Sequence, residues 1–225
     1  MGESWWQGDA LIPHSPPAVR CPPASCTYLS TKRISLMRLV IGLIVSLLAA
    51  SAGAQEMQFV KDPAHSEINF VAESRLLDAH GFWETWDASL TFDPSAWDRS
   101  SVKITIDTRS VNTRSPMRDT HLRSRDFFHA DSFPQITFQS KIVNKLGDTK
   151  VNVTGDLAIR GITKTVTIPA TLVFWDDAGK TGRFKGQFTV LRNEFGVGYN
   201  PPGNPIADEV VVSFNVTFRQ PKPAP

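Results

Sequence analysis

Histidine, serine and acidic side chains are the residue types in this chain that could support catalysis or hold a metal ion. After residue 54 the sequence contains four histidines: His65, His80, His121 and His129. No two of them have the i, i+2 spacing of a strand or the HExxH spacing of a helix that brings two imidazoles to one ion. Ser124 lies near His121 and Asp126 in sequence, but no GxSxG turn is present to expose a serine nucleophile. The spacing therefore predicts neither a metal site nor a catalytic triad.

Arginines alternate with aspartates between Arg114 and Asp126. A solvated helix with salt bridges between neighbouring turns, each worth about 0.2–0.5 kcal/mol, would explain the alternating signs. A guanidinium at the mouth of a cavity could instead hold a phosphate, a carboxylate or a quinone oxygen. Both interpretations stay open. In the second interpretation, five residues are candidates for the mouth: His80, Arg118, His121, Arg123 and Tyr199. Tyr199 comes from the Gly-, Pro- and Asn-rich loop 193–207, of a kind that commonly shapes an entrance.

Strict alternation of apolar and polar residues predicts the elements that would position these side chains. In DEVVVSFNVTF (208–218), the valines and phenylalanines at even positions fall on one side of an extended strand. Eight such strands are expected, near residues 67–72, 86–92, 102–107, 135–139, 151–159, 166–174, 184–190 and 208–218. Short strands separated by turn signals favour an all-β antiparallel sandwich or barrel. Eight strands make a closed barrel that either just fills or holds one ligand.

The inner faces of these eight strands carry no charged residue. They include the small residues Ala72, Ala88, Ala170 and Gly186, which leave space that a solid core would fill. A barrel packed solid by its own side chains is the alternative. One helix is expected over Ser115–Arg125, with Ser115 as N-cap and Pro116 at the first helical position. It should lie across a barrel end, as a lid seated by nearby phenylalanines.

Residues 37–54 have the pattern expected of an export signal. Met37 and Arg38 precede an apolar run, residues 39–50, and then small residues up to Ala54. This pattern predicts a signal peptide over 37–54, cleaved after Ala54, because the run is shorter than the roughly 20 residues that span a bilayer. Residues 1–36, which hold both cysteines, are expected to be a disordered extension or a misassigned start. The product would be a periplasmic or secreted domain, residues 55–225, with a short disordered C-terminal tail.

Residues 1–54 contain four of the 24 basic and two of the 22 acidic residues, so residues 55–225 carry 20 of each and no net charge. A balanced charge gives no electrostatic reason to expect a nucleic acid as partner.

Several sequence blocks resemble the YceI-like family. RDTHLRSRDFF (118–128) and FPQITFQS (133–140) are similar to its central signature, GDLAIRGITKTVTI (155–168) to a second block and RNEFGVG (192–198) to a third. The similarity extends over residues 58–219, with the blocks in order. It implies an exported, lipocalin-like barrel that binds a long polyisoprenoid or quinone-like lipid in its interior. It also implies a possible association with a cytochrome b-type membrane protein.

The sequence thus predicts a binding protein without cofactor or catalytic residues, which sequesters or carries a long isoprenoid or acyl chain. There are two alternatives. The protein could be an accessory protein of a membrane cytochrome b-type redox system, or an enzyme that acts on a lipid at the barrel mouth. The residues expected to line the apolar interior are Phe70, Trp86, Leu90, Phe92, Ile104, Phe138, Val153, Leu172, Phe188 and Phe214. Ligand identity and oligomeric state are not determined by the sequence.

Overall fold

The computed structural model describes residues 57–221 except 94, 179 and 204. Within this part of the chain, a single antiparallel sheet contains the strands β1 (Met57–Lys61), β2 (Glu67–Ser74), β3 (Ala79–Trp83), β4 (Trp86–Phe92), β5 (Ser101–Asp107), β6 (Val111–Asn112), β7 (Gln135–Lys145), β8 (Lys150–Ile159), β9 (Ile162–Asp176), β10 (Thr181–Leu191) and β11 (Ile206–Arg219). Short 3₁₀ segments interrupt it at η1 (Pro63–His65), η2 (Trp97–Arg99), η3 (Thr108–Ser110) and η4 (Arg192–Phe195). No helix in this part of the chain is long and apolar enough to cross a membrane.

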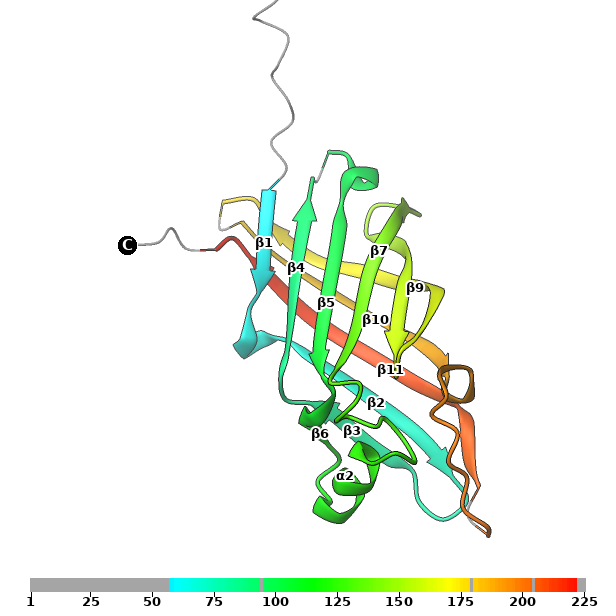
Figure 1. The fold of residues 1–225 in the computed structure, drawn as a ribbon. Coiled ribbons are helices and arrows are strands. Elements are labelled where there is room, and N and C mark those ends of the chain that lie inside the picture. Colours follow the sequence, from blue (N-terminus) through cyan, green and yellow to red (C-terminus); the bar gives the residue numbers. More distant parts are fainter. Residues whose placement is uncertain (1–56, 94, 179, 204, 222–225) are drawn as a thin grey trace, which may run out of the picture. The chain divides into compact units, whose positions relative to one another are not determined.

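Eight strands form a closed ring in the order β1-β4-β5-β7-β8-β9-β10-β11, because β1 pairs with both β4 and β11 (Figure 1). The predicted all-β, eight-stranded antiparallel barrel is therefore confirmed. However, the eight strands of the ring are not the same eight segments that the sequence predicts. The short strand β1 closes the ring. The predicted strand β2 pairs with the other end of β11, and the sheet continues from β2 to β3 and β6.

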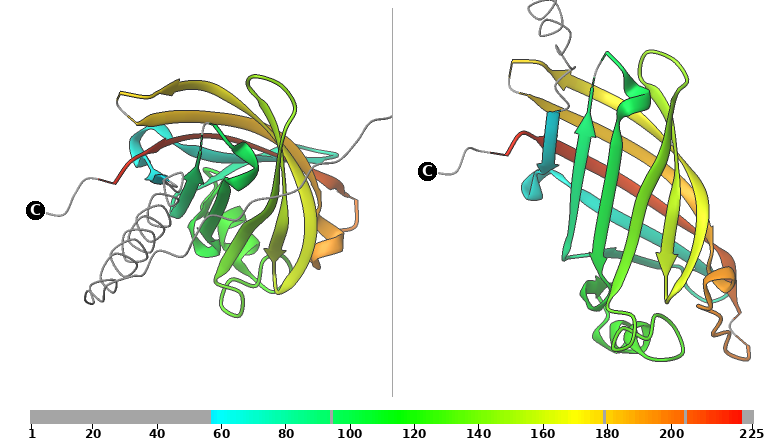
Figure 2. Two further views of the ribbon diagram at one scale, coloured as in Figure 1. Left: turned by 90° about the horizontal axis from the view of Figure 1, so that it is seen from above. Right: turned by 45° about the horizontal axis from the view of Figure 1, so that its top comes forward.

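The helix α2 (Pro116–Arg123) lies at one end of the barrel, beside β6 (Figures 1 and 2). It begins at Pro116 after an extended Ser115, as predicted, but the Ser115 side chain makes no capping hydrogen bond. The carboxylate of Asp119 instead accepts from the backbone nitrogen and the hydroxyl of Thr113, at 2.8 and 2.6 Å. This buried pair holds the start of the helix against the loop that precedes it.

Arg160 fixes the segment that follows α2. It occupies the β8–β9 turn with Gly161, and both have positive φ (50° and 76°), as the two-residue hairpin turn requires. Its guanidinium donates to the carbonyls of Phe127, Arg125 and Gly196. One side chain therefore joins the α2 segment to the loop after η4, which lies at the same barrel end.

Aromatic side chains close the opposite end. The ring of Phe92 lies 4.8 Å from Trp175, 5.5 Å from Trp97 and 5.9 Å from Phe184, centroid to centroid, with edge-to-face geometry. Trp175 faces inward because the β9–β10 pairing contains a β-bulge, which changes the face that successive residues present. Regular alternation from Ile168 and Ala170 predicts that Phe174 lies on the inner face. This is wrong for the same reason, since Phe174 is 45% exposed.

Candidate functional site

The interior of the ring is a cavity of about 610 Å³. This is within the roughly 300–1,000 Å³ that ligand pockets in proteins occupy. Its wall is formed by aliphatic and aromatic side chains from β2 to β5 and from β7 to β11. Polar groups line it mainly toward the α2 end, from Arg118, His121, Arg192 and Tyr199. The cavity is therefore apolar along its length and polar at one end.

Inner-face side chains near the middle of the barrel show that the interior is hollow. Ile104, Val153, Phe188 and Phe214 lie in the cavity wall, yet each stays only partly buried. A packed core would leave no accessible surface on such residues. Gly186 does not create this space, because a Cβ there would collide with the ring of Phe214.

Eight of the ten residues expected in the apolar interior line the cavity: Phe70, Leu90, Phe92, Ile104, Phe138, Val153, Phe188 and Phe214. Trp86 and Leu172 do not. Trp86 is buried on the same face as Leu90 and Phe92, but at the start of β4, where the amino group of Lys61 lies 4.2 Å from its ring centroid. Leu172 precedes the β9 bulge, and its backbone nitrogen donates to the carbonyl of Thr149.

Lys61 adds a charged residue beside the inner face of β4, from a strand outside the eight predicted segments. It follows the buried Phe59 by two positions in β1, a strand that the sequence analysis missed, and donates to the carbonyl of Trp86. Burial lowers the pKa of its amino group, and the nearby Asp87 opposes this.

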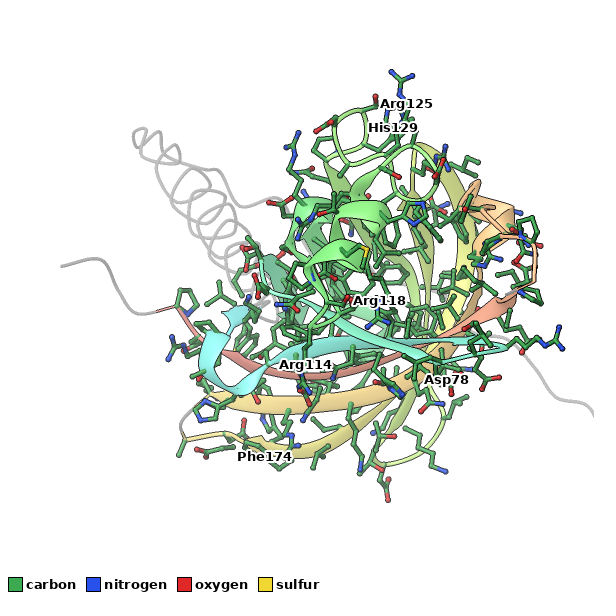
Figure 3. The ribbon with its side chains drawn as sticks, turned by 90° about the horizontal axis from the view of Figure 1, so that it is seen from below. Asp78, Arg114, Arg118, Arg125, His129 and Phe174 are labelled. Atoms are coloured by element: carbon green, nitrogen blue, oxygen red, sulfur yellow. The ribbon has the colours of Figure 1, made fainter. Side chains whose placement is uncertain are left out.

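The cavity opens at the end where α2 lies. Leu77, in the turn between β2 and β3, lines the cavity and is 69% exposed, so the lumen reaches solvent beside this turn. Pro201, in the loop between η4 and β11, lines the same opening. Figure 3 shows this end of the barrel. Arg118 lies on the helix, Arg114 lies just before it, and Asp78 lies on the β2–β3 turn. The mouth is thus bordered by three segments far apart in sequence.

Arg118, His121 and Tyr199 meet at this mouth, as predicted for rim residues. The ring of His121 lies 4.9 Å from that of Tyr199, and its Nε2 is 2.8 Å from a carboxylate oxygen of Asp126. Arg118 donates from Nε to the hydroxyl of Thr113 and from Nη2 to its carbonyl. These contacts orient a cation, an imidazole and a phenol toward one opening.

His80 and Arg123, the other two expected rim residues, lie outside the cavity wall. His80 is exposed in β3, opposite Val71 of β2. The guanidinium of Arg123 donates to the carbonyl of Val111, 3.1 Å away, and so holds α2 against β6.

Arg192 is the residue of the mouth that the sequence analysis missed. It is 5% exposed, lines the cavity and donates to the carbonyls of four residues in the η4–β11 loop and the start of β11: Val197, Tyr199, Ile206 and Ala207. Burial lowers the pKa of its guanidinium, while Asp208 nearby acts in the opposite direction. All four acceptors are backbone atoms, so no residue pattern in the sequence marks them as its partners.

The described residues form no group of three or more histidine, cysteine or acidic side chains that could hold a metal ion. Ser124 lies near the His121–Asp126 pair, but its hydroxyl donates to the carbonyl of His121 at 2.7 Å and not to the imidazole. The arrangement orients polar groups at the mouth without presenting a serine to a base.

The closed antiparallel ring, its hollow apolar interior and the helix across its mouth define a lipocalin-like β-barrel, a class whose interior holds one small ligand. The sequence profile of the YceI-like domain matches residues 59–218. The chain belongs to the YceI-like family. It is 34% identical over 165 residues to Protein YceI of Shigella flexneri and of Escherichia coli O157:H7, which covers 70% of this chain and 86% of each relative.

Solved structures have the same architecture. BcnA of Burkholderia cenocepacia superposes with a TM-score of 0.65 at 31% identity, over 70% of this chain and 98% of that one. The YceI protein of Campylobacter jejuni gives 0.59 at 25% identity, over 66% and 88%. A polyisoprenoid-binding domain from Saccharophagus degradans, implicated in plant cell wall breakdown, gives 0.60 at 15% identity, over 74% and 100%. At that identity the last match shows the fold alone.

Proposed function

We propose that this protein is an exported binding protein that carries or sequesters a long isoprenoid or quinone-like lipid. The hollow apolar cavity of about 610 Å³ is the observation that carries this proposal. The ligand's hydrocarbon chain occupies the lumen between the mouth and the aromatic cluster around Phe92, and its polar end stays near Arg118, His121 and Tyr199.

The hydrophobic effect supplies the affinity. Each buried methylene contributes about 0.8 kcal/mol, whereas association costs about 4–15 kcal/mol in lost freedom. About ten carbons, worth about 8 kcal/mol, leave little net affinity, while about twenty carbons contribute about 16 kcal/mol. The affinity therefore depends on how many carbons the ligand buries in the cavity, which favours isoprenoids of several units over short fatty acids.

One of the solved structures supports the proposal. The Saccharophagus degradans domain is described as polyisoprenoid-binding, which agrees with an apolar chain in a barrel of this fold. The lumen wall itself offers no nucleophile beside a base, so we propose that the protein binds its lipid without chemical change. A cytochrome b-type membrane protein is the partner suggested by the family resemblance, and its retention in a pull-down would extend the proposal to delivery of a quinone.

Lipid extraction tests the proposal. The protein should be purified from the periplasmic fraction of an exporting host without detergent, its N-terminus sequenced, and its organic extract analysed by mass spectrometry. We expect an N-terminus at Gln55 and about one long-chain lipid per protein.

Neighbouring valines of β11 provide a matched pair. Val212 lines the cavity, whereas Val211, the residue before it in the strand, faces away. Val212→Glu should lose the lipid because it places a charge in the lumen, and Val211→Glu should retain it. An extract without any long-chain lipid, or equal lipid content in the two variants, would refute the proposal.

A further inference from the structure

The end of the barrel that holds the mouth carries the most exposed large apolar side chains of the described residues. Met117 of α2 is 84% exposed, and Leu76 and Leu77 of the β2–β3 turn are 77% and 69% exposed. These three residues, which we call the apolar rim, exceed every other large hydrophobic residue described. Exposure of such side chains opposes solubility, so a cluster around one opening points to a surface that covers it.

Arginines accompany the apolar rim. The segment from Arg114 to Asp126 and the turn from Glu73 to Asp78 carry three exposed carboxylates and four exposed arginines, which are Arg75, Arg114, Arg123 and Arg125. Arg114 and Arg125 are exposed, and both are labelled at this end in Figure 3. The fourth carboxylate, Asp119, is buried and accepts from Thr113, and Asp126 pairs with His121. The exposed charge of these two segments is therefore positive, although residues 55–225 carry none in total.

Leu77 connects the rim to the lumen, because it is both largely exposed and part of the cavity wall. Any surface that covers the rim therefore covers the mouth. The apolar rim, with cations around it, suits the water–lipid boundary of a bilayer. At that boundary, apolar groups enter the acyl region and arginines contact anionic head groups.

We propose that the apolar rim, with Arg114 and Arg125, docks the barrel mouth-first onto a bilayer surface that carries anionic head groups. This rests on the proposed function, since a lipid can pass between bilayer and lumen without crossing water only when the mouth faces the membrane. Docking places Leu76, Leu77 and Met117 at the acyl boundary and the two arginines among the phosphates.

Vesicle sedimentation tests the docking proposal. The strand ring closes within residues 57–219, so the delipidated protein of residues 55–225 can be used without the apolar run 39–50. It should sediment with vesicles of phosphatidylethanolamine and phosphatidylglycerol, and less with pure phosphatidylcholine. Replacing Leu76, Leu77 and Met117 together by Glu should weaken partitioning by about tenfold or more, because the inserted apolar area is lost. Arg114→Gln with Arg125→Gln should weaken binding to the anionic vesicles alone, by about fivefold or more.

The matched control lies at the opposite end of the barrel. Ile142 and Leu146 are 54% and 62% exposed at the end of β7, and their replacement by Glu should leave partitioning unchanged. Wild-type protein that stays in the supernatant overturns the docking proposal, as does a rim variant that sediments like wild type. Capture of a membrane protein through the rim, without binding to vesicles, overturns it too.

The same preparations separate the two proposals. Lipid content before delipidation reports on the lumen, whereas sedimentation reports on the rim. Normal lipid content without vesicle binding refutes docking alone, and vesicle binding without extractable lipid refutes the lumen as the lipid site.

Discussion

Val153→Trp should block the lumen without unfolding the barrel. Val153 lies on β8, lines the cavity and is only partly buried, so a larger side chain there would extend into empty space. The indole adds about seven non-hydrogen atoms and so excludes about one five-carbon isoprene unit of the ligand, which is worth about 4 kcal/mol at 0.8 kcal/mol per carbon. The dissociation constant of a bound chain should rise by about three orders of magnitude. Overpacking strain should stay near 1 kcal/mol because the space is free.

Fluorescence titration with retinol, an isoprenoid alcohol whose emission increases in apolar sites, measures this change on delipidated protein. Val173→Trp is the matched control, because Val173 is 42% exposed on the same sheet and the substitution is identical. It should bind retinol as wild type does. A folded Val153→Trp protein that binds retinol within about twofold of wild type would show that the chain does not enter the lumen, since even two excluded carbons cost about tenfold.

Three other predictions address the mouth, the acid response and the ligand. Arg192→Met should lower the free energy of unfolding in urea by about 2–4 kcal/mol, because the buried carbonyls of the mouth loop lose their donor; a loss below about 0.5 kcal/mol would contradict this. The Lys141 amino group, 2.7 Å away, and the Thr165 hydroxyl hold the pKa of the Asp156 carboxyl below its usual value, so its stabilisation is present near neutral pH and lost as pH falls through the lowered pKa. Asp156→Asn should therefore be less stable than wild type at about pH 7, and the difference in the free energy of unfolding should shrink as the pH falls through the lowered pKa; a constant difference would count against this ion pair. Retinol at about 100 times its Kd should stabilise delipidated protein by about 2.7 kcal/mol and raise its Tm, whereas an unchanged Tm would mean that native protein does not bind it.

The regular strands were predictable because each repeats one physical pattern. β11 alternates from Val210 to Phe218, and the even-numbered residues of this stretch all line the cavity. Gly161 in the β8–β9 hairpin turn has positive φ and is the residue type that such turns favour. By contrast, β1 loses its alternation where Val60 follows Phe59, β6 has only two residues, and β3 carries the exposed His80 beside glycine.

The parts that escaped prediction depend on contacts between distant residues. Nothing local to β9 indicates that a bulge with β10 turns Trp175 inward and leaves Phe174 exposed. Trp86 satisfies the alternation of β4, yet Lys61 of β1 occupies the space beside it. Arg192 binds backbone carbonyls, which every sequence supplies equally.

A crystal structure of the lipid-loaded protein tests the central claim most directly. The account predicts continuous density for one hydrocarbon chain from the mouth beside Leu77 and Tyr199 into the lumen, ending before the ring of Trp97. A lumen filled by its own side chains, or a lipid bound on the outer surface with the interior empty, would contradict it.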